Sequence, residues 1–290
     1  MLILQKKILR GLRMKIHIAN PTGLCFGVKR AISTLEEELL TMKKVYSLGS
    51  PIHNPQEIER LSKLGLVVVD RPEDVPIGAV SFVRAHGVTP QTYEKLKQRS
   101  SIMVDGTCPF VKTAQERAKD LSKEGYLVVI SGDMKHPEVQ GIMGYATGDV
   151  IVLSDADKIP PSLAGRKCGI LSQTTQKVAS FVSLVSSFVS ISPEIKVYNT
   201  ICKATLARQE SVCRLAAEVD GIIVLGGKNS ANTKKLAEIA VDAGVSTVWI
   251  EHAGELDRGW LENKEDIGIA AGGSTPDWLI RELTQKLNMM

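Results

Sequence analysis

Three cysteines occupy the same place in a local pattern, and they are the first residues that could do chemistry. Each follows an apolar run and a short polar turn and precedes a helical pattern: K-I-H-I-A-N-P-T-G-L-C for Cys25, S-I-M-V-D-G-T-C for Cys108 and I-K-V-Y-N-T-I-C for Cys202. Ligands of open α/β sheets bind beyond the carboxyl ends of the strands, at loops that lead into helices. We therefore expect each thiol at the carboxyl-end edge of a sheet, which we call the rim, and we expect the chain to contain three copies of this rim.

A polar residue recurs 28 positions after each cysteine (25 to 53, 108 to 136 and 202 to 230), namely His53, His136 and Ser230. Each again follows an apolar run and precedes a helical pattern. Equal spacing in all three thirds of the chain indicates an internal repeat rather than three unrelated loops.

A third strand end completes each repeat and offers His86, Thr174 or Ser274. Its distance from the cysteine drifts (25 to 86, 108 to 174 and 202 to 274, or 61, 66 and 72 positions), as loops of variable length would make it. Three copies of this rim, facing inward, predict one shared site.

Threefold symmetry would bring Cys25, Cys108 and Cys202 together at its centre. Three thiolates without a fourth cysteine suit one [4Fe-4S] cluster with an open iron, free of a protein ligand, and an open metal position can act as a Lewis acid. Zinc is the competing interpretation. Structural zinc sites commonly use close pairs such as C-x-x-C, which this sequence lacks, so we favour the cluster.

The remaining rim positions are rich in hydrogen-bond donors. Histidines, hydroxyls, amides and helix N-terminal N–H groups together predict a site for a small anion such as a phosphate or diphosphate. A lone loop histidine is more often a cap or a surface residue, but three of the five histidines fall on strand ends of the repeat. The predicted donors are His53, His86, His136, Thr174, Ser230, Asn232 and Ser274.

Glu138, two residues past His136, is the one carboxylate of this rim. It could merely complement the dipole of the helix in whose first turn it lies. Its place on the rim also suits a proton donor, because a carboxyl group screened from water can hold its proton near neutral pH and deliver it.

The other cysteines and histidines fall outside the repeat. Cys168 lies within a strand pattern and Cys213 within a helical pattern, and we expect both in the core, where free cysteine behaves as a small hydrophobe. His17, within a strand, and His252, after the run V-W-I-E, are expected to be structural.

Strands that alternate with helices must position these residues. Such alternation predicts the α/β class, with parallel sheets and right-handed crossovers, here in three pseudo-symmetric α/β domains. The continuous apolar runs suit sheets covered on both faces. We place the repeats at residues 14–100, 101–194 and 195–290, and we expect residues 1–13 to be a poorly ordered extension, with a short basic amphipathic helix as the alternative.

The composition excludes several classes of protein. With 43% hydrophobic and 23% charged residues, the 290-residue chain is an ordinary globular protein. A net charge of +4 and 4% aromatic residues give no basic stripe or stacking platform for nucleic acid. No run is long enough for a membrane span and no signal peptide is recognisable. We therefore expect a cytoplasmic protein, in which cysteines serve metal binding or catalysis.

Nine ordered motifs resemble those of the LytB family, the 4-hydroxy-3-methylbut-2-enyl diphosphate reductases of non-mevalonate isoprenoid synthesis, and the resemblance extends from Met14 to Leu287. The motifs are G-L-C-F-G-V-K-R-A-I, S-P-I-H-N-P, R-A-H-G-V, D-G-T-C-P-F-V, K-H-P-E-V-Q-G, S-Q-T-T, N-T-I-C-K-A-T, K-N-S-A-N-T and G-G-S-T-P.

The resemblance implies a trefoil of three domains around an iron–sulfur cluster held by Cys25, Cys108 and Cys202. Two electrons and two protons would remove the substrate's allylic hydroxyl as water, giving isopentenyl and dimethylallyl diphosphates. It further suggests that the first strand, residues 14–26, packs with the third domain. The residues implied to bind the diphosphate are His53, His86, His136, Ser230, Asn232 and Ser274, while Thr174 and Glu138 would deliver protons.

Two further points follow from the motifs. Ala231 stands where the family usually has a serine, so it can contribute only its backbone N–H. No G-x-G-x-x-G dinucleotide fingerprint is present, and the family resemblance implies a protein electron donor of the ferredoxin or flavodoxin type.

Two other functions fit parts of the pattern. A cluster dehydratase resembling quinolinate synthase would act on a dicarboxylate, but such a site should prefer arginine clamps. A cluster-based sensor would need the three cysteines but neither Glu138 nor Thr174.

Overall fold

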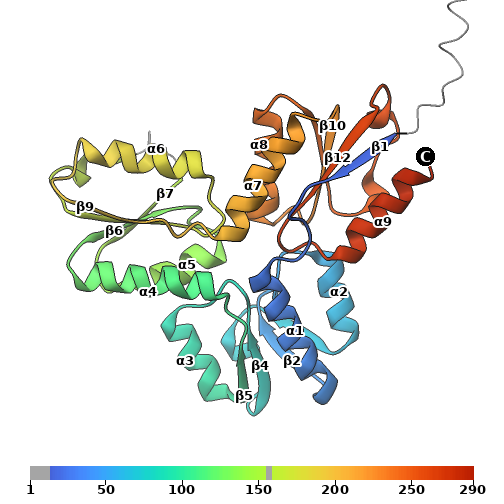
Figure 1. Ribbon diagram of the computed structural model, residues 1–290. Coiled ribbons are helices and arrows are strands. Elements are labelled where there is room, and N and C mark those ends of the chain that lie inside the picture. The colour runs from blue at the N-terminus through green and yellow to red at the C-terminus, as the bar shows by residue number, and fades with distance from the viewer. Residues whose placement is uncertain (1–13, 155–158) are drawn as a thin grey trace, which may run out of the picture.

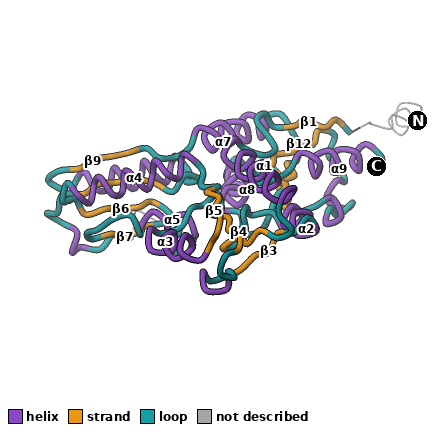
Figure 2. Tube along the Cα trace, turned by 90° about the horizontal axis from the view of Figure 1, so that it is seen from below, coloured by secondary structure: helices purple, strands orange, loops and turns teal. Residues whose placement is uncertain are grey.

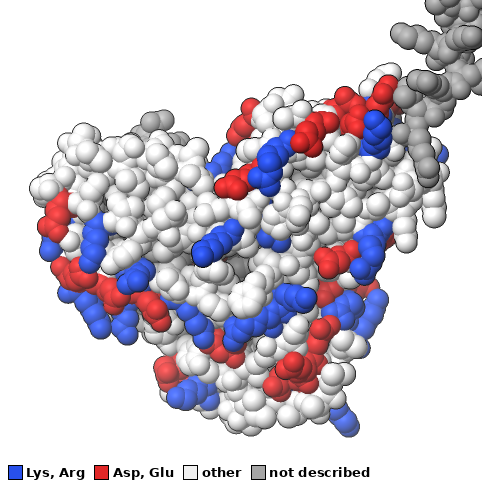
Figure 3. Space-filling view, viewed as in Figure 1, with Lys and Arg blue, Asp and Glu red and all other residues white. Residues whose placement is uncertain are grey.

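The computed structural model describes residues 14–154 and 159–290. The extension predicted at residues 1–13 lies outside the described part of the chain. Figure 1 shows three lobes arranged around a common centre, and Figure 2, seen from below, shows that the lobes lie side by side in one flattened body. Charged side chains of both signs are interspersed over the face in Figure 3.

The first two lobes each contain a four-stranded sheet. One is built from β2 (Val45–Leu48), β3 (Leu66–Val69), β4 (Ala79–Val83) and β5 (Ser100–Asp105), in the order β3-β2-β4-β5. The other is built from β6 (Leu127–Ser131), β7 (Val150–Leu153), β8 (Cys168–Ser172) and β9 (Ile195–Tyr198), in the order β7-β6-β8-β9.

The third lobe repeats this plan with β10 (Gly221–Leu225), β11 (Ser246–Ile250), β12 (Asp266–Ala271) and β1 (Lys15–Ile18), in the order β11-β10-β12-β1. All described strand pairs are parallel. The predicted α/β class with three parallel-sheet units is confirmed.

Helices cover the sheets. They are α1 (Phe26–Thr41), α2 (Pro55–Lys63), α3 (Pro90–Arg99), α4 (Pro109–Lys123), α5 (Pro137–Met143), α6 (Val178–Val189), α7 (Lys203–Ala216), α8 (Ala231–Asp242) and α9 (Asp277–Asn288), with short 3₁₀ turns at Pro72–Asp74, Pro161–Leu163, Ala253–Glu255 and Gly259–Leu261. In α1, residues Ala31, Leu35 and Leu39 face the core at helical spacing. Among the described helices, none is long and apolar enough to cross a membrane.

The strand before each cysteine joins the sheet of the neighbouring lobe. β5 and β9 begin at Ser100 and Ile195, where the sequence placed repeat boundaries, yet each completes the preceding sheet. β1 likewise pairs with β12, from Lys15 opposite Asp266 to Ile18 opposite Ile269. Sheet membership thus differs from the boundaries 14–100, 101–194 and 195–290 by one strand. We propose that the lobes are the domains and that each cysteine lies where two of them meet.

Candidate active site

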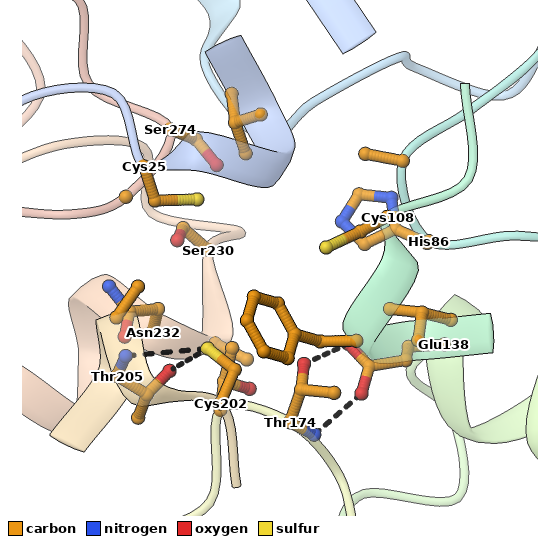
Figure 4. Close-up of a pocket in the computed structure, with 18 of the residues that line it drawn as sticks. Cys25, His86, Cys108, Glu138, Thr174, Cys202, Thr205, Ser230, Asn232 and Ser274 are labelled. Carbon is orange, nitrogen blue, oxygen red and sulfur yellow. Dashed lines mark hydrogen bonds between the residues drawn. The ribbon is translucent and has the colours of Figure 1, made fainter. Parts of the chain in front are cut away.

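The three cysteines stand at the N-termini of equivalent helices. Cys25, Cys108 and Cys202 are the N-cap residues of α1, α4 and α7, so the positive ends of three helix dipoles point at their sulfurs. All three thiols are free. Figure 4 shows the sulfurs turned toward one cavity.

Close packing brings the cysteines of different lobes together. A Cβ added at Gly27 would lie 2.3 Å from Cys108 Sγ, so only glycine allows α1 to approach that sulfur. A Cβ at Gly273 would lie 3.4 Å from Cys25 Sγ. Burial raises the pKa of Cys108 to about 11 and also raises that of Cys202, and the neighbouring sulfurs add to both shifts. A cation among the sulfurs would reverse these shifts, because a coordinating thiol loses its proton, so the donor set fits a metal centre.

Three histidines form a second cluster in the cavity. The ring centroids of His53 and His86 are 4.2 Å apart, and His136 lies 5.4 and 5.5 Å from them. Burial, more than the neighbouring charges, lowers the pKa of His53 to about 4 and of His136 to about 3, and it lowers that of His86 as well. All three rings are therefore neutral near pH 7.

The tautomer of His136 favours an anion over a metal ion at this cluster. The ring nitrogens lie within 4.8 Å of one another, a spacing that could also suit a metal. However, His136 Nδ1 accepts the backbone N–H of Glu138 (3.2 Å), so in the neutral ring Nε2 carries the proton and can only donate. Both ring nitrogens of His53 and Nδ1 of His86 are buried without a partner among the described residues.

The third lobe supplies small polar groups opposite the histidines. Ser230 caps α8 by accepting the Thr233 N–H (3.3 Å), and Ala231, Asn232 and Ser274 line the same wall. Asn232 Nδ2 is buried without a described partner. Figure 4 shows Ser230, Asn232 and Ser274 together on this side of the cavity. Unpaired buried donors on both walls predict a polar ligand between them.

Glu138 is buried at the start of α5 and reaches across to the loop after β8. Its carboxylate accepts the backbone N–H (2.6 Å) and the hydroxyl (2.9 Å) of Thr174. Burial raises the pKa of Glu138, although these two hydrogen bonds lower it. Glu138 lies in the first turn of α5, where it can interact with the helix dipole. Its carboxylate nevertheless forms its hydrogen bonds with the loop after β8 and not with its own helix. A carboxyl group in this setting can hold and move a proton.

All the residues that the sequence predicted for the site line one cavity; its empty space, about 660 Å³, includes part of the open solvent at its mouth. The structure thus brings together Cys25, His53, His86, Cys108, His136, Glu138, Thr174, Cys202, Ser230, Ala231, Asn232 and Ser274.

Several lining residues escaped the sequence analysis. Thr205 lies three residues past Cys202 and donates its backbone N–H to that sulfur (3.3 Å), a capping spacing that could have been found. Arg208 donates to the Gly23 (2.7 Å) and Ala204 (3.1 Å) carbonyls. No local sequence pattern predicts that Arg208 lines the cavity. Thr175 and apolar residues such as Phe110 complete the lining.

The residues outside the repeat give a mixed outcome. Cys168 is fully buried, as predicted. The prediction for Cys213 is wrong, because α7 buries Val212 and Leu215 and turns Cys213 to solvent. His17 contacts Asp266 Oδ1 at 2.7 Å, and His252 accepts the Gly254 N–H, so both have the structural roles expected of them.

Comparison with known proteins gives concordant matches. The family model described as LytB protein matches residues 16–288. The 4-hydroxy-3-methylbut-2-enyl diphosphate reductase of Geobacter sulfurreducens is 43% identical over 274 residues, covering 94% of this chain and 97% of the relative. The enzyme of the same name from Aquifex aeolicus is 43% identical over 276 residues, covering 94% and 95%.

Two solved structures are also similar. One is described as (E)-4-hydroxy-3-methyl-but-2-enyl diphosphate reductase, the terminal enzyme of the non-mevalonate pathway; it is 42% identical, covers 96% of this chain and 100% of that chain, and gives a TM-score of 0.70. The other is the E-1-hydroxy-2-methyl-but-2-enyl-4-diphosphate reductase of Plasmodium falciparum, which is 29% identical, covers 96% and 88%, and gives 0.87.

Proposed function

The chain belongs to the LytB protein family, and on this premise we propose that the cavity between its lobes is the active site of a 4-hydroxy-3-methylbut-2-enyl diphosphate reductase. The protein is then an oxidoreductase of the non-mevalonate isoprenoid pathway. The reaction adds two electrons and two protons to the substrate, breaks the allylic C–O bond and releases water with isopentenyl or dimethylallyl diphosphate. The observation that carries this function is the family match over residues 16–288.

The family match supports an iron–sulfur enzyme, and we assign one [4Fe-4S] cluster to Cys25, Cys108 and Cys202. The support for this finer assignment is the convergence of three free thiols at three helix N-termini in one cavity. Such a cluster supplies electrons and an open iron with Lewis-acid character when it is bound. The chain's own part is to hold the three sulfurs and to exclude further ligands from the centre.

The diphosphate is assigned to the two donor walls. His53, His86 and His136 donate from one side, and Ser230, Asn232 and Ser274 donate from the other, with the backbone N–H of Ala231 at the start of α8. The buried, unpaired ring nitrogens of His53 and the unpaired amide of Asn232 support this role, because such groups are expected to find partners in the bound state.

Glu138 and Thr174 are assigned to proton delivery, together with His136, which caps the helix that carries Glu138. The hydroxyl of Thr174 contacts the Glu138 carboxylate at 2.9 Å, so a proton held on the carboxyl group can pass through this hydroxyl toward the substrate. The raised pKa of Glu138 keeps a larger fraction of the acid form than an exposed glutamate would have.

The electron donor is assigned to the class of small acidic carriers, ferredoxin or flavodoxin. The helices that follow the cysteines, α1, α4 and α7, carry no acidic residue in their described first turns, although helix dipoles favour acids there. They expose Lys29, Lys112 and Lys203 instead, of which Lys112 is paired with Asp105 (2.6 Å). Phe26, the first residue of α1, is 65% exposed. Lysine and arginine side chains lie over the middle of this face in Figure 3, where these helices start in Figure 1.

The other two candidate functions have less support. The only arginine among the described residues that line the cavity, Arg208, is already bonded to two backbone carbonyls, so no open clamp for a dicarboxylate is available. A sensor would have no use for the buried contact between Glu138 and Thr174.

One anaerobic experiment tests the function. Protein prepared without oxygen should be brown, carry about four irons per chain, and reduce the diphosphate with a chemical reductant to the two isomeric products. Tightly bound zinc in place of iron would refute the cluster, and turnover of a dicarboxylate but not of the diphosphate would refute the substrate.

A further inference from the structure

Arg84 lies between the two strands that lead to His53 and His86, and it has no ion-pair partner among the described residues. It follows β4 and precedes His86 by two residues. Its guanidinium packs over the loop that leads to His53, since a Cβ added at Gly49 would lie 2.2 Å from Arg84 Nη1. Its Nε is buried without a hydrogen-bond partner among the residues that the structure describes. Throughout residues 14–154 and 159–290, no carboxylate forms an ion pair with it.

An unpaired guanidinium in this position has an energetic cost. Arginine stays protonated in proteins, and removing a charge from water is unfavourable unless a counter-charge or hydrogen bonds compensate. Burial lowers the pKa of Arg84, and no carboxylate offsets that effect. The missing counter-charge therefore points to an anion that the protein binds.

The field of Arg84 acts on each histidine of the cluster. Burial is the main cause of the lowered pKa of each ring, and the charge of Arg84 adds to it for all three; His53 and His136 contribute at His86, His53 and Lys235 contribute at His136, and Asp133 acts in the opposite direction at His136. Arg84 is thus the one fixed charge, among the described residues, that acts on all three rings. It adds to the effect of burial in opposing their protonation, so the rings are neutral N–H donors.

We propose that Arg84 is a positioning residue for the diphosphate: its fixed charge attracts the anion through the histidines and takes the place of protons that they would otherwise have to bind. The inference rests on the proposed function, since it names the source of positive charge for the same site. The neutral histidines then orient the phosphate oxygens. The Arg84 guanidinium balances part of the charge of the diphosphate, so the histidines do not have to take up protons.

The test is binding of inorganic diphosphate to the anaerobically prepared, cluster-containing protein, measured by calorimetry in buffers of different ionisation enthalpy at pH 8 and pH 6. Arg84→Gln should weaken binding roughly tenfold at pH 8, as expected for the loss of a nearby charge that makes no direct hydrogen bond to the anion. At pH 6 this variant should lose less affinity for diphosphate and should take up more protons on binding. Without the charge of the guanidinium, the histidines can be protonated more readily when the anion binds. Arg84→Lys should restore most of the affinity.

Two controls separate this role from a structural one. Arg71→Gln removes an exposed arginine whose ion pair in the described chain is with Asp74, and it should leave binding unchanged. Wild-type protein should take up little or no proton at pH 8 when diphosphate binds, a measurement that still decides the matter if the Gln variant does not fold.

The proposal is overturned if Arg84→Gln binds like wild type, if the Lys and Gln variants lose equal affinity at both pH values, or if the wild-type protein needs protons to bind the anion. Because no turnover is involved, a failure of the reductase assay would leave this result interpretable.

Discussion

Cysteine and histidine here occupy helix N-cap positions that serine, threonine, aspartate and asparagine usually fill. In the described chain, Cys25 and Cys108 make no side-chain cap bond at all. A lost cap costs about 1 kcal/mol. Their sulfurs instead line the cavity at the helix N-termini, where they are available to a metal centre.

Glu138→Gln is expected to keep the cluster and the substrate affinity but to lose roughly 10²–10⁴-fold in turnover, the usual worth of a positioned acid. The amide can still bond to Thr174, so the fold of the loop should persist. Because burial raises the pKa of Glu138, its acid form persists to higher pH than usual, and wild-type turnover should fall as pH rises through that value.

Thr174→Ser is the matched control, since it keeps the hydroxyl that contacts Glu138 and should retain most activity. Steady-state kinetics with a chemical reductant, alongside iron content, measure both variants. Turnover of Glu138→Gln within a few-fold of wild type would remove the carboxyl group from proton delivery.

Ala231→Ser should tighten binding of the diphosphate roughly two- to tenfold, because it adds one hydroxyl donor to the wall formed by Ser230 and Asn232. Ala231 is only partly buried and lines the cavity at the start of α8, so the extra oxygen has room. Titration with inorganic diphosphate gives the affinity. An unchanged or weaker affinity would mean that the position acts through its backbone alone.

At the scale of elements, glycines set how closely the cysteine-bearing helices meet. Gly27, in the first turn of α1, is buried against Cys108 of α4. Any larger residue there would push the first turns of these two helices, and with them two of the three sulfurs, apart.

Gly27→Ala should therefore reduce the iron bound per chain and destabilise the folded protein by about 1–3 kcal/mol, as overpacking does. Iron analysis and denaturant unfolding measure the two effects. Gly259→Ala is the control, because an added Cβ there meets nothing nearer than the Asp257 side chain at 3.3 Å. A full complement of iron in Gly27→Ala would show that the helices can separate without losing the cluster.

The whole molecule is built by a cyclic exchange of strands between lobes. β1, β5 and β9 each complete a neighbour's sheet next to β12, β4 and β8, and each then leads to a cysteine. The three lobes are thereby tied together in the backbone around the centre that the cysteines share.

The exposed lysines at the starts of α1 and α7 should matter only for reduction by a protein donor. Lys29→Glu together with Lys203→Glu should slow reduction by ferredoxin or flavodoxin roughly tenfold or more at low salt, because charge steering governs such encounters. Reduction by dithionite should not change. Lys97→Glu with Lys119→Glu, two exposed lysines on α3 and α4, serves as the control pair, and equal slowing by both pairs would contradict a specific face.

The positions of the cysteines, His53, His136 and Ser230 could be predicted because strand ends and helix starts are local features. The spacing of 28 residues spans one helix of 14–16 residues, one strand of 4 or 5 residues and the loops that join them. The family motifs carried the same residues, and the structure brings all of them into one cavity.

Other features depend on contacts between residues far apart in the chain, and only the tertiary structure decided them. β5 and β9 joined the preceding sheets because pairing depends on which edge is adjacent in space. Cys213 turned out exposed because the core lies on the other face of α7. The proposed role of Arg84 could be inferred only from the fold, which places its guanidinium near a cluster of three histidines from two lobes. The effect of a charge on binding depends on the groups that surround it, and the sequence does not give these.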